Sequence, residues 1–176
     1  MRIQLGLWLA GSLLFAAAHV AVADDFEDGL RSYIRSDFTK AYELLSPLAE
    51  QGNARAQSIL ATMYRFGEGV AVDAEKAAFL MRQASLQGSV AAQYNLAQLY
   101  LTGFGVEQSI VHAMMWLTIA LDEIGYEEFV RDSGASVRQP ITEFRQSVVS
   151  QVNFLDIARA LDMAATCRQS KYQDCE

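Results

Sequence analysis

The chain repeats itself with a period of 36 residues, and this period constrains its fold more than any other feature. Tyr64–Val70 reads YRFGEGV and Tyr100–Val106 reads YLTGFGV, so the same Gly-x-Gly spacing returns one period later. Residues 51–86 superpose on 87–122 without a gap and are identical at 12 of 36 positions. The identical positions are Gln51, Gly52, Ala56, Gln57, Leu60, Ala61, Tyr64, Gly67, Gly69, Val70, Ala77 and Ala84, each paired with the residue one period later. Such a period predicts a solenoid built by stacking one supersecondary unit.

Each unit is predicted to contain a first helix that ends at the glycines. The shared positions recur at helical spacing over 54–66, which predicts a helix there. Gly67 and Gly69 follow this helix, and Gly103 and Gly105 follow its copy, as expected for a left-handed cap and a tight turn. A Gly-x-Gly loop can also hold a phosphate, but no lysine or serine follows at phosphate-loop spacing. The repetition therefore favours a turn that folds one helix back on its neighbour.

A second helix is predicted to begin at Asp73 in each unit. Asp37 and Ser109 stand one period before and after Asp73, and all three are strong N-cap residues. The inward-facing positions of this helix are expected to be Ala77, Leu80, Met81 and Ala84. Upstream, DFEDGLRSYIR over 25–35 predicts a first, capping helix. Pro47 lies inside the helix that follows Asp37, where it is expected to cause a bend.

The stretch from Ala56 to Val106 resembles the Sel-one-like repeats, relatives of the tetratricopeptide repeats. Their pattern is close to A-x-x-x-L-[GA]-x-x-Y-x-x-G-x-G-V-x-x-D-x-x-K-A, and the match covers about 37–122. The opening residues 25–33 and the ending with Cys167, Tyr172 and Cys175 are similar to those of exported bacterial members. The chain departs from the pattern at Ala61 and Ala97, where glycine is usual, at 109–112, and beyond Trp116.

Together the period and the resemblance imply an all-α fold. It would be a short right-handed superhelical solenoid of antiparallel helix pairs, closed by an irregular C-terminal helical cap. The expected segments are an N-terminal cap with the first unit over 24–52, repeats over 53–88 and 89–122, and the cap over 123–176. Within the cap, two irregular helices around a loop at Ser133–Gln139 are expected to precede a helix over Asn153–Arg168, with Asn153 as its N-cap.

Residues 1–23 are predicted to be a secretory signal peptide. Arg2, an apolar stretch to about Ala18 and the A-x-A pattern at 21–23 indicate cleavage between Ala23 and Asp24. An uncleaved membrane anchor is the main alternative, but the apolar stretch is shorter than the roughly 20 residues that a span needs. The chain is therefore expected to cross the inner membrane and reside in the periplasm, with no membrane span after signal removal.

The two cysteines, Cys167 and Cys175, are predicted to form a disulfide. Both lie near the C-terminus, and an exported chain meets an oxidising compartment. A metal or redox role is the less favoured alternative, because His112 is the one histidine outside the signal peptide. No cofactor or metal is expected.

The net charge argues against nucleic acid as a partner. The chain has 14 basic and 21 acidic residues, a formal net charge of −7. An acidic surface repels a polyphosphate backbone, so nucleic-acid binding is not expected.

No catalytic residues are predicted. The sequence contains neither Ser-x-x-Lys nor Gly-x-Ser-x-Gly, and a cysteine nucleophile would have to stay reduced outside the cell. His112 is interpreted as an exposed helical residue in the place of Lys76. Four carboxylates, Asp122, Glu123, Glu127 and Glu128, are interpreted as a solvated helix end.

What remains is a face of the first helices that differs between the copies. Its positions carry Arg55, Ser58, Thr62 and Arg65 in one unit and Ala91, Tyr94, Gln98 and Leu101 in the next. First helices line the concave groove of tetratricopeptide-like stacks, so these side chains are expected to project there. Either they bind a partner or they simply meet water. We predict partner binding by Arg55, Ser58, Thr62, Arg65, Tyr94, Gln98 and Leu101.

The leading functional hypothesis is therefore an exported, non-catalytic interaction module or scaffold that binds proteins of the cell envelope. The alternative is a cell-envelope enzyme or binder that acts on peptidoglycan fragments or β-lactams. A third possibility is a small stable element within a larger secretion or polysaccharide-export assembly.

Overall fold

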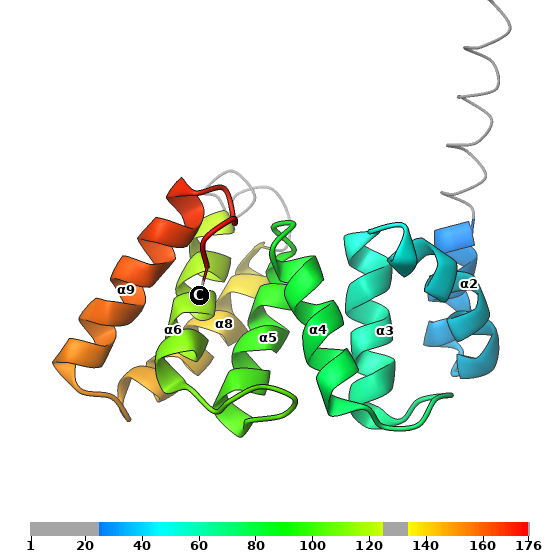
Figure 1. Ribbon diagram of the computed structural model, residues 1–176, viewed down its shortest axis with the longest axis horizontal. Helices are drawn as coiled ribbons and strands as arrows, with labels where there is room; N and C mark the ends of the chain where they lie inside the picture. The colour runs from blue at the N-terminus through cyan, green and yellow to red at the C-terminus, as the bar shows by residue number, and fades with distance from the viewer. Residues whose placement is uncertain (1–24, 125–133, 176) are drawn as a thin grey trace, which may run out of the picture.

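The computed structural model describes residues 25–124 and 134–175, and over these residues the regular elements are all helices. The chain is helical over 25–34 and then forms α2 (Phe38–Glu50), α3 (Ala54–Phe66), α4 (Ala74–Ser85), α5 (Val90–Thr102), α6 (Ile110–Glu123), α8 (Gly134–Val149) and α9 (Phe154–Gln169). Each helix from α2 to α6 packs on the next, and both α8 and α9 pack on α6 (Figure 1). The predicted all-α solenoid of helix pairs is confirmed.

The second helices begin at the predicted N-caps. The side chains of Asp37, Asp73 and Ser109 accept hydrogen bonds from the backbone N–H three residues later in α2, α4 and α6. Asn53 and Ser89 cap the first helices α3 and α5 in the same way and are also one period apart. Each cap satisfies one of the N–H groups that a helix start leaves without a partner. The period therefore fixes where both helices of a unit begin.

The two glycines of each turn have different tasks. Gly67 and Gly103 end α3 and α5 in the left-handed conformation, with φ of 73° and 70°. The second glycine touches the previous unit: a Cβ on Gly105 would lie 1.9 Å from the backbone oxygen of Ala74, the first residue of α4. A Cβ on Gly69 would lie 2.7 Å from Cβ of Phe38, the first residue of α2. The turn therefore sets the spacing between units as well as the fold within one.

A buried glutamine in each first helix joins neighbouring units. Gln57 and Gln93 are 6% and 0% exposed, and their side-chain amides donate to the backbone oxygens of Ala49 and Ser85. These carbonyls lie at the ends of α2 and α4, where each also accepts a backbone N–H of the following turn, from Gly52 or Gly88 at 3.0 Å, so the glutamine adds a second donor. The shared glutamine is thus a cap for the preceding helix, a role that the sequence alone did not reveal.

Hydrophobic burial is greatest in α6. Nine consecutive residues of α6, from Ala113 to Leu121, are buried, because α5, α8 and α9 surround this helix. In α4, Ala77, Met81 and Ala84 are buried as predicted, and Leu80 is half-buried. Pro47 is exposed and does not interrupt α2.

The prediction of a loop at Ser133–Gln139 is wrong over 134–139, the part that the structure describes. Helix α8 begins at Gly134 and continues through Pro140 to Val149. Ile141 and Val148 of α8 are buried in the core that also holds α6. Tertiary burial of this apolar stripe outweighs the local loop signals of glycine, serine and proline.

The C-terminal cap ends in the predicted disulfide. Cys167, at the end of α9, is bonded to Cys175, and both are buried. Asn153 caps α9 as predicted, accepting from the backbone N–H of Asp156 at 2.9 Å. The two cysteines are eight residues apart in the sequence, and the disulfide holds the segment after α9 against the solenoid.

Candidate functional site

The structure separates the shared and variable positions of the first helices. The shared positions of α3 and α5 are buried, including Leu60, Tyr64, Leu96 and Tyr100. The predicted binding positions lie together on the accessible side of these helices: Arg55 is exposed, and Ser58, Thr62, Arg65, Tyr94, Gln98 and Leu101 are half-buried. We call the surface formed by these seven residues the first-helix face.

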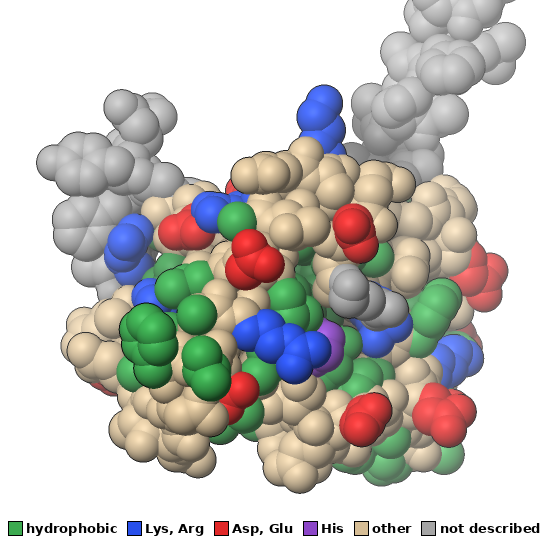
Figure 2. Space-filling model, turned by 60° about the vertical axis from the view of Figure 1, so that its left-hand side comes forward, with side chains coloured by type: hydrophobic (Ala, Val, Ile, Leu, Met, Phe, Trp, Pro, Cys, Tyr) green, Lys and Arg blue, Asp and Glu red, His purple; other side chains and the backbone are tan. Residues whose placement is uncertain are grey.

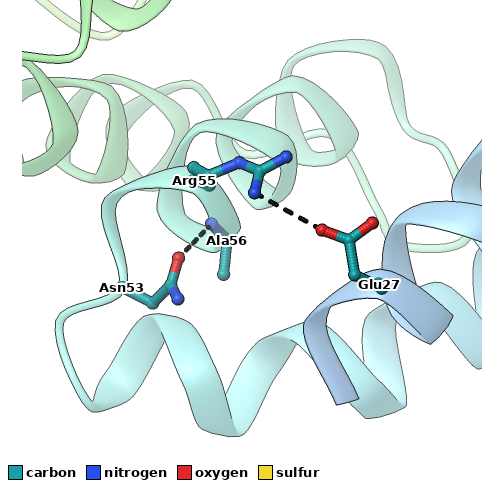
Figure 3. A network of polar contacts seen from close by, with 4 residues as sticks. All are labelled: Glu27, Asn53, Arg55 and Ala56. Atoms are coloured by element: carbon teal, nitrogen blue, oxygen red, sulfur yellow. Dashed lines mark hydrogen bonds and ion pairs between the residues drawn. The ribbon is translucent and has the colours of Figure 1, made fainter. Parts of the chain in front are cut away.

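At its N-terminal end, Arg55 ties α3 to the helix over 25–34 (Figure 3). Its guanidinium lies 3.4 Å from the Glu27 carboxylate and 4.2 Å from the centre of the Phe26 ring. Asn53 starts the same helical turn by accepting from the backbone N–H of Ala56 at 3.0 Å. Arg55 and Glu27 are both more than half exposed, so a partner can compete for either charge.

In the middle of the first-helix face, a hydrogen bond links the two units. Arg65 donates to the Gln98 side-chain oxygen at 3.1 Å, and its guanidinium lies 5.1 Å from the Phe66 ring centre. Thr62 donates to the backbone oxygen of Ser58 at 3.0 Å, so its hydroxyl is turned back on its own helix. This part of the face therefore presents an Arg–Gln pair as its main polar group.

The C-terminal end of the first-helix face contacts helix α8. The Tyr94 ring meets the ring of Phe144 edge-on, with 5.5 Å between centres. Leu101 also packs against the core. Tyr94 thus holds the C-terminal cap in place, a contact that sequence reasoning missed because Phe144 lies in a segment without the repeat.

The opposite side of the solenoid carries a groove between the second helices α2 and α4. This α2–α4 groove has a volume of about 430 Å³ and is lined by Tyr42, Glu50, Gln57, Tyr64, Lys76 and Phe79, among others. The hydroxyls of Tyr42 and Tyr64 lie 3.0 Å apart. The Lys76 ammonium lies 4.5 Å from the Tyr64 ring centre, a cation–π distance. Burial raises the pKa of the Tyr64 hydroxyl above its ordinary value.

His112 is more enclosed than predicted. It is half-buried and stacks on Tyr100, with 5.0 Å between ring centres and 17° between ring planes. Ser109 Oγ lies 2.7 Å from His112 Nδ1 and also accepts from the His112 backbone N–H. His112 and Tyr100 stand one period after Lys76 and Tyr64. The imidazole ring of His112 therefore takes the place of the Lys76 ammonium over the equivalent tyrosine. The earlier interpretation as an exposed residue is therefore corrected.

Two of the four clustered carboxylates anchor the C-terminal segment. Asp122 forms an ion pair with Arg168, and Glu123 accepts a hydrogen bond from the Tyr172 hydroxyl. Burial, together with this hydrogen bond, raises the pKa of Tyr172 to about 12. Burial and a 2.9 Å hydrogen bond to Glu68 likewise raise the pKa of Tyr33 to about 12. Glu127 and Glu128 lie outside the described residues.

Charged and apolar side chains are interspersed over the face shown in Figure 2. Among the described residues, no three His, Cys, Asp or Glu side chains come close enough to hold a metal ion. Within the same part of the chain, none of the helices combines the length and apolar character that crossing a bilayer requires.

Comparison with protein families identifies the repeat. The model of the Sel1 repeat matches three times, at residues 16–53, 54–89 and 90–123, which together make up more than half of the chain. The chain belongs to the Sel1 repeat family. Its first Sel1 match begins inside the predicted signal peptide and includes the helix over 25–34. Sel1 repeat proteins are helical-repeat modules that mediate protein–protein interaction.

Solved structures of Sel1-type proteins share the fold. A protective antigen of uropathogenic Escherichia coli strains with an SLR fold matches with a TM-score of 0.65 and 23% identity, over 87% of this chain and 30% of the antigen. A Sel1 repeat protein from Oxalobacter formigenes matches with a TM-score of 0.55 and 29% identity, over 58% of this chain and 41% of that one. The chain thus spans less than half of either structure. No curated protein matches its sequence.

Proposed function

We propose that the chain is an exported, non-catalytic protein-binding module of the bacterial cell envelope, and that the first-helix face recognises its partner. The observation that carries this proposal is the division within α3 and α5. Within these helices the positions shared by the repeats are buried, whereas the seven residues of the first-helix face stay at least partly accessible. Burial explains the repeated residues through packing, so the differing ones that remain accessible are available for specific contacts.

Two observations support export to the periplasm. The first 23 residues have the pattern of a cleavable signal, and they lie outside the described residues. Cys167 and Cys175 form a disulfide, which persists in an oxidising compartment. The partner is accordingly a protein of the envelope, and the acidic net charge of −7 disfavours nucleic acid.

Site-specific photo-crosslinking tests this proposal. Benzoylphenylalanine is placed at Thr62 or Gln98 in the full chain, expressed in its host, and adducts are resolved from the envelope fraction. Thr39 and Glu75, which are exposed on the second helices, are the control positions. We expect a discrete adduct from Thr62 and Gln98 alone. Equal adducts from the controls, or none from the first-helix face, would refute the proposal.

A charge reversal then tests specificity. Arg65→Glu removes the donor to Gln98 and reverses the charge in the middle of the first-helix face, so it is expected to reduce the Thr62 adduct by about tenfold, which corresponds to roughly 1.4 kcal/mol of binding free energy. Arg159→Glu, on the exposed surface of α9, is the matched control and should leave the adduct unchanged.

The alternative function, an enzyme or binder for peptidoglycan fragments or β-lactams, has one specific contact in its favour. Ser109 Oγ and His112 Nδ1 lie 2.7 Å apart beside a cavity of about 430 Å³ that Arg82 and Tyr100 also line. Helix capping accounts for this contact, because Ser109 starts α6 and the two residues are three apart. Turnover of a chromogenic β-lactam by the full chain, lost in Ser109→Ala, would establish the enzyme instead.

A further inference from the structure

The α2–α4 groove has an equivalent one period further along the chain. Ser46, Glu50 and Leu80 line the α2–α4 groove, and Arg82, Leu86 and Trp116 stand 36 residues after them. These three later residues line a smaller cavity between α4 and α6, of about 300 Å³. The solenoid therefore presents the same kind of groove twice, and the two can be compared position by position.

The chain's own C-terminal segment occupies the α4–α6 groove. Residues 172–175 line the remaining cavity together with Arg82, Leu86 and Trp116. Tyr172 packs against the hydrophobic core, and its hydroxyl donates to Glu123. Hydrogen bonding with the Gln93 side chain lowers the pKa of this hydroxyl, against the larger effect of burial. Cys175 is 7% exposed and is held by the disulfide. A peptide segment with one half-buried aromatic ring therefore lies in this groove.

The corresponding surface of the α2–α4 groove is open. Phe79 lines it and is 60% exposed, whereas the equivalent residue Met115 is fully buried. Gln57, the equivalent of Gln93, also lines it, so the group beside Tyr172 in one groove is present in the other. Phe79 thus places an accessible aromatic ring on the wall of a concave surface, a setting that favours a ligand.

We propose that the α2–α4 groove binds a peptide segment of a partner protein that inserts one aromatic side chain, as Tyr172 is inserted between α4 and α6. The exposed Phe79 ring supplies the apolar contact, and the Tyr42 hydroxyl supplies a polar partner for a tyrosine tip. The groove carries both the Lys76 ammonium and the Glu50 carboxylate, so an acidic residue of the peptide is expected on the Lys76 side, next to the aromatic one. None of the seven residues of the first-helix face lines this groove, so the two sites are separate.

A peptide-display selection tests this site. Short random peptides are selected on the full, disulfide-bonded chain, and binding of the enriched peptides is measured by fluorescence polarisation. Phe79→Ala is compared with Phe66→Ala, because the two phenylalanines are 60% and 61% exposed and Phe66 does not line the groove. Circular dichroism verifies that both variants fold, as expected for exposed positions.

We expect the enriched peptides to share an aromatic residue next to an acidic one. Their affinity should fall at least about tenfold in Phe79→Ala and stay unchanged in Phe66→Ala, as for an aromatic contact at the centre of an interface. Replacing the aromatic residue of the peptide with alanine should have the same effect. The Arg65→Glu variant should bind normally, which separates this site from the first-helix face.

Three outcomes would overturn the proposal. These are a selection that yields no binding peptide, enriched peptides without an aromatic residue, and peptides whose affinity does not depend on Phe79. In each case sedimentation is measured as well. Self-association of the wild type that is lost in Phe79→Ala would show that a second copy of the chain covers the groove.

Discussion

The repeat region and the C-terminal cap use different means to hold neighbouring helices together. Over α2 to α5, the contacts recur with the period: N-caps, glycine turns and glutamine caps occupy equivalent positions in successive units. In the cap, single long-range contacts take over: the disulfide, the Arg168–Asp122 ion pair, the Tyr172–Glu123 hydrogen bond and the Tyr94–Phe144 ring contact. Stability in the repeats is thus distributed, whereas the cap depends on a few individual residues.

The largest expected effect is at the joint between units. In Gly105→Ala the new Cβ would overlap the Ala74 backbone oxygen, and the residue has a φ of 70°. We expect unfolding free energy to fall by about 3 kcal/mol or more, since strain and overpacking add. Urea denaturation followed by circular dichroism measures this loss.

Gly88→Ala is the matched control for that joint. Gly88 has a φ of 80°, but no atom lies within 4 Å of its added Cβ. It should therefore lose only the conformational contribution, about 1 kcal/mol. Equal losses of unfolding free energy in the two variants would show that the positive φ alone explains the need for glycine at both positions. The contact between Gly105 and Ala74 would then be less tight than described.

The next effect concerns the cap. Replacing both cysteines, Cys167→Ser with Cys175→Ser, should cost about 2–3 kcal/mol for a loop of this length. Because the contacts of the cap are individual, we expect local opening before global unfolding. Limited trypsin digestion should cut after Lys171 in this variant and leave α3 to α5 intact. Uniform digestion of the whole chain would contradict the difference between the two regions.

A smaller effect is expected at the N-cap of α4. Asp73→Ala removes the acceptor for the Lys76 backbone N–H, which lies 2.9 Å away, and should cost about 1 kcal/mol. Asp73→Ser places the residue of the next unit at this position and should retain most of the stability. A shift in thermal midpoint that is the same for alanine and serine would remove capping as the cause.

The smallest effect is a loss of stability at alkaline pH. The pKa of Tyr33 and that of Tyr172 are raised from 10.0 to about 12, because both are partly buried and donate to a carboxylate. Their contribution is therefore fully present below pH 10 and is lost as pH rises toward 12. Urea midpoints of the wild type should fall over this range by more than those of Tyr33→Phe with Tyr172→Phe. Parallel curves would assign the loss to other groups.

The helix pairs could be predicted because their signals are local and repeated. Asp73 starts a helix and Gly67 ends one within a single unit, and the period presents each signal again in the next. The glutamine caps also have a signal in the sequence, since Gln57 recurs as Gln93 in an otherwise apolar stripe. Its role required the structure, because the accepting carbonyl lies at the end of the preceding helix.

The cap could not be predicted to the same extent. Residues Gly134 and Pro140 of α8 are local loop signals, and burial of Ile141 against the core outweighs them. Tyr94 was predicted to bind a partner from its position alone. Its contact with Phe144 spans 50 residues without a period, so no pattern in the sequence connects the two. The binding role of the first-helix face stays a prediction.

The contact of Gly105 with Ala74 has a consequence for how such arrays grow. The joint is made mainly of backbone at the first residue of a helix, with Ala78 Cβ also close by, so it depends on few of the side chains that the units carry. A duplicated 36-residue segment would contain both its own turn glycine and the helix start that the glycine of the next unit contacts. Gene duplication can therefore lengthen the array in single steps while each copy diverges freely at its surface. The longer Sel1-type structures, of which this chain spans 30% and 41%, are what such growth would produce.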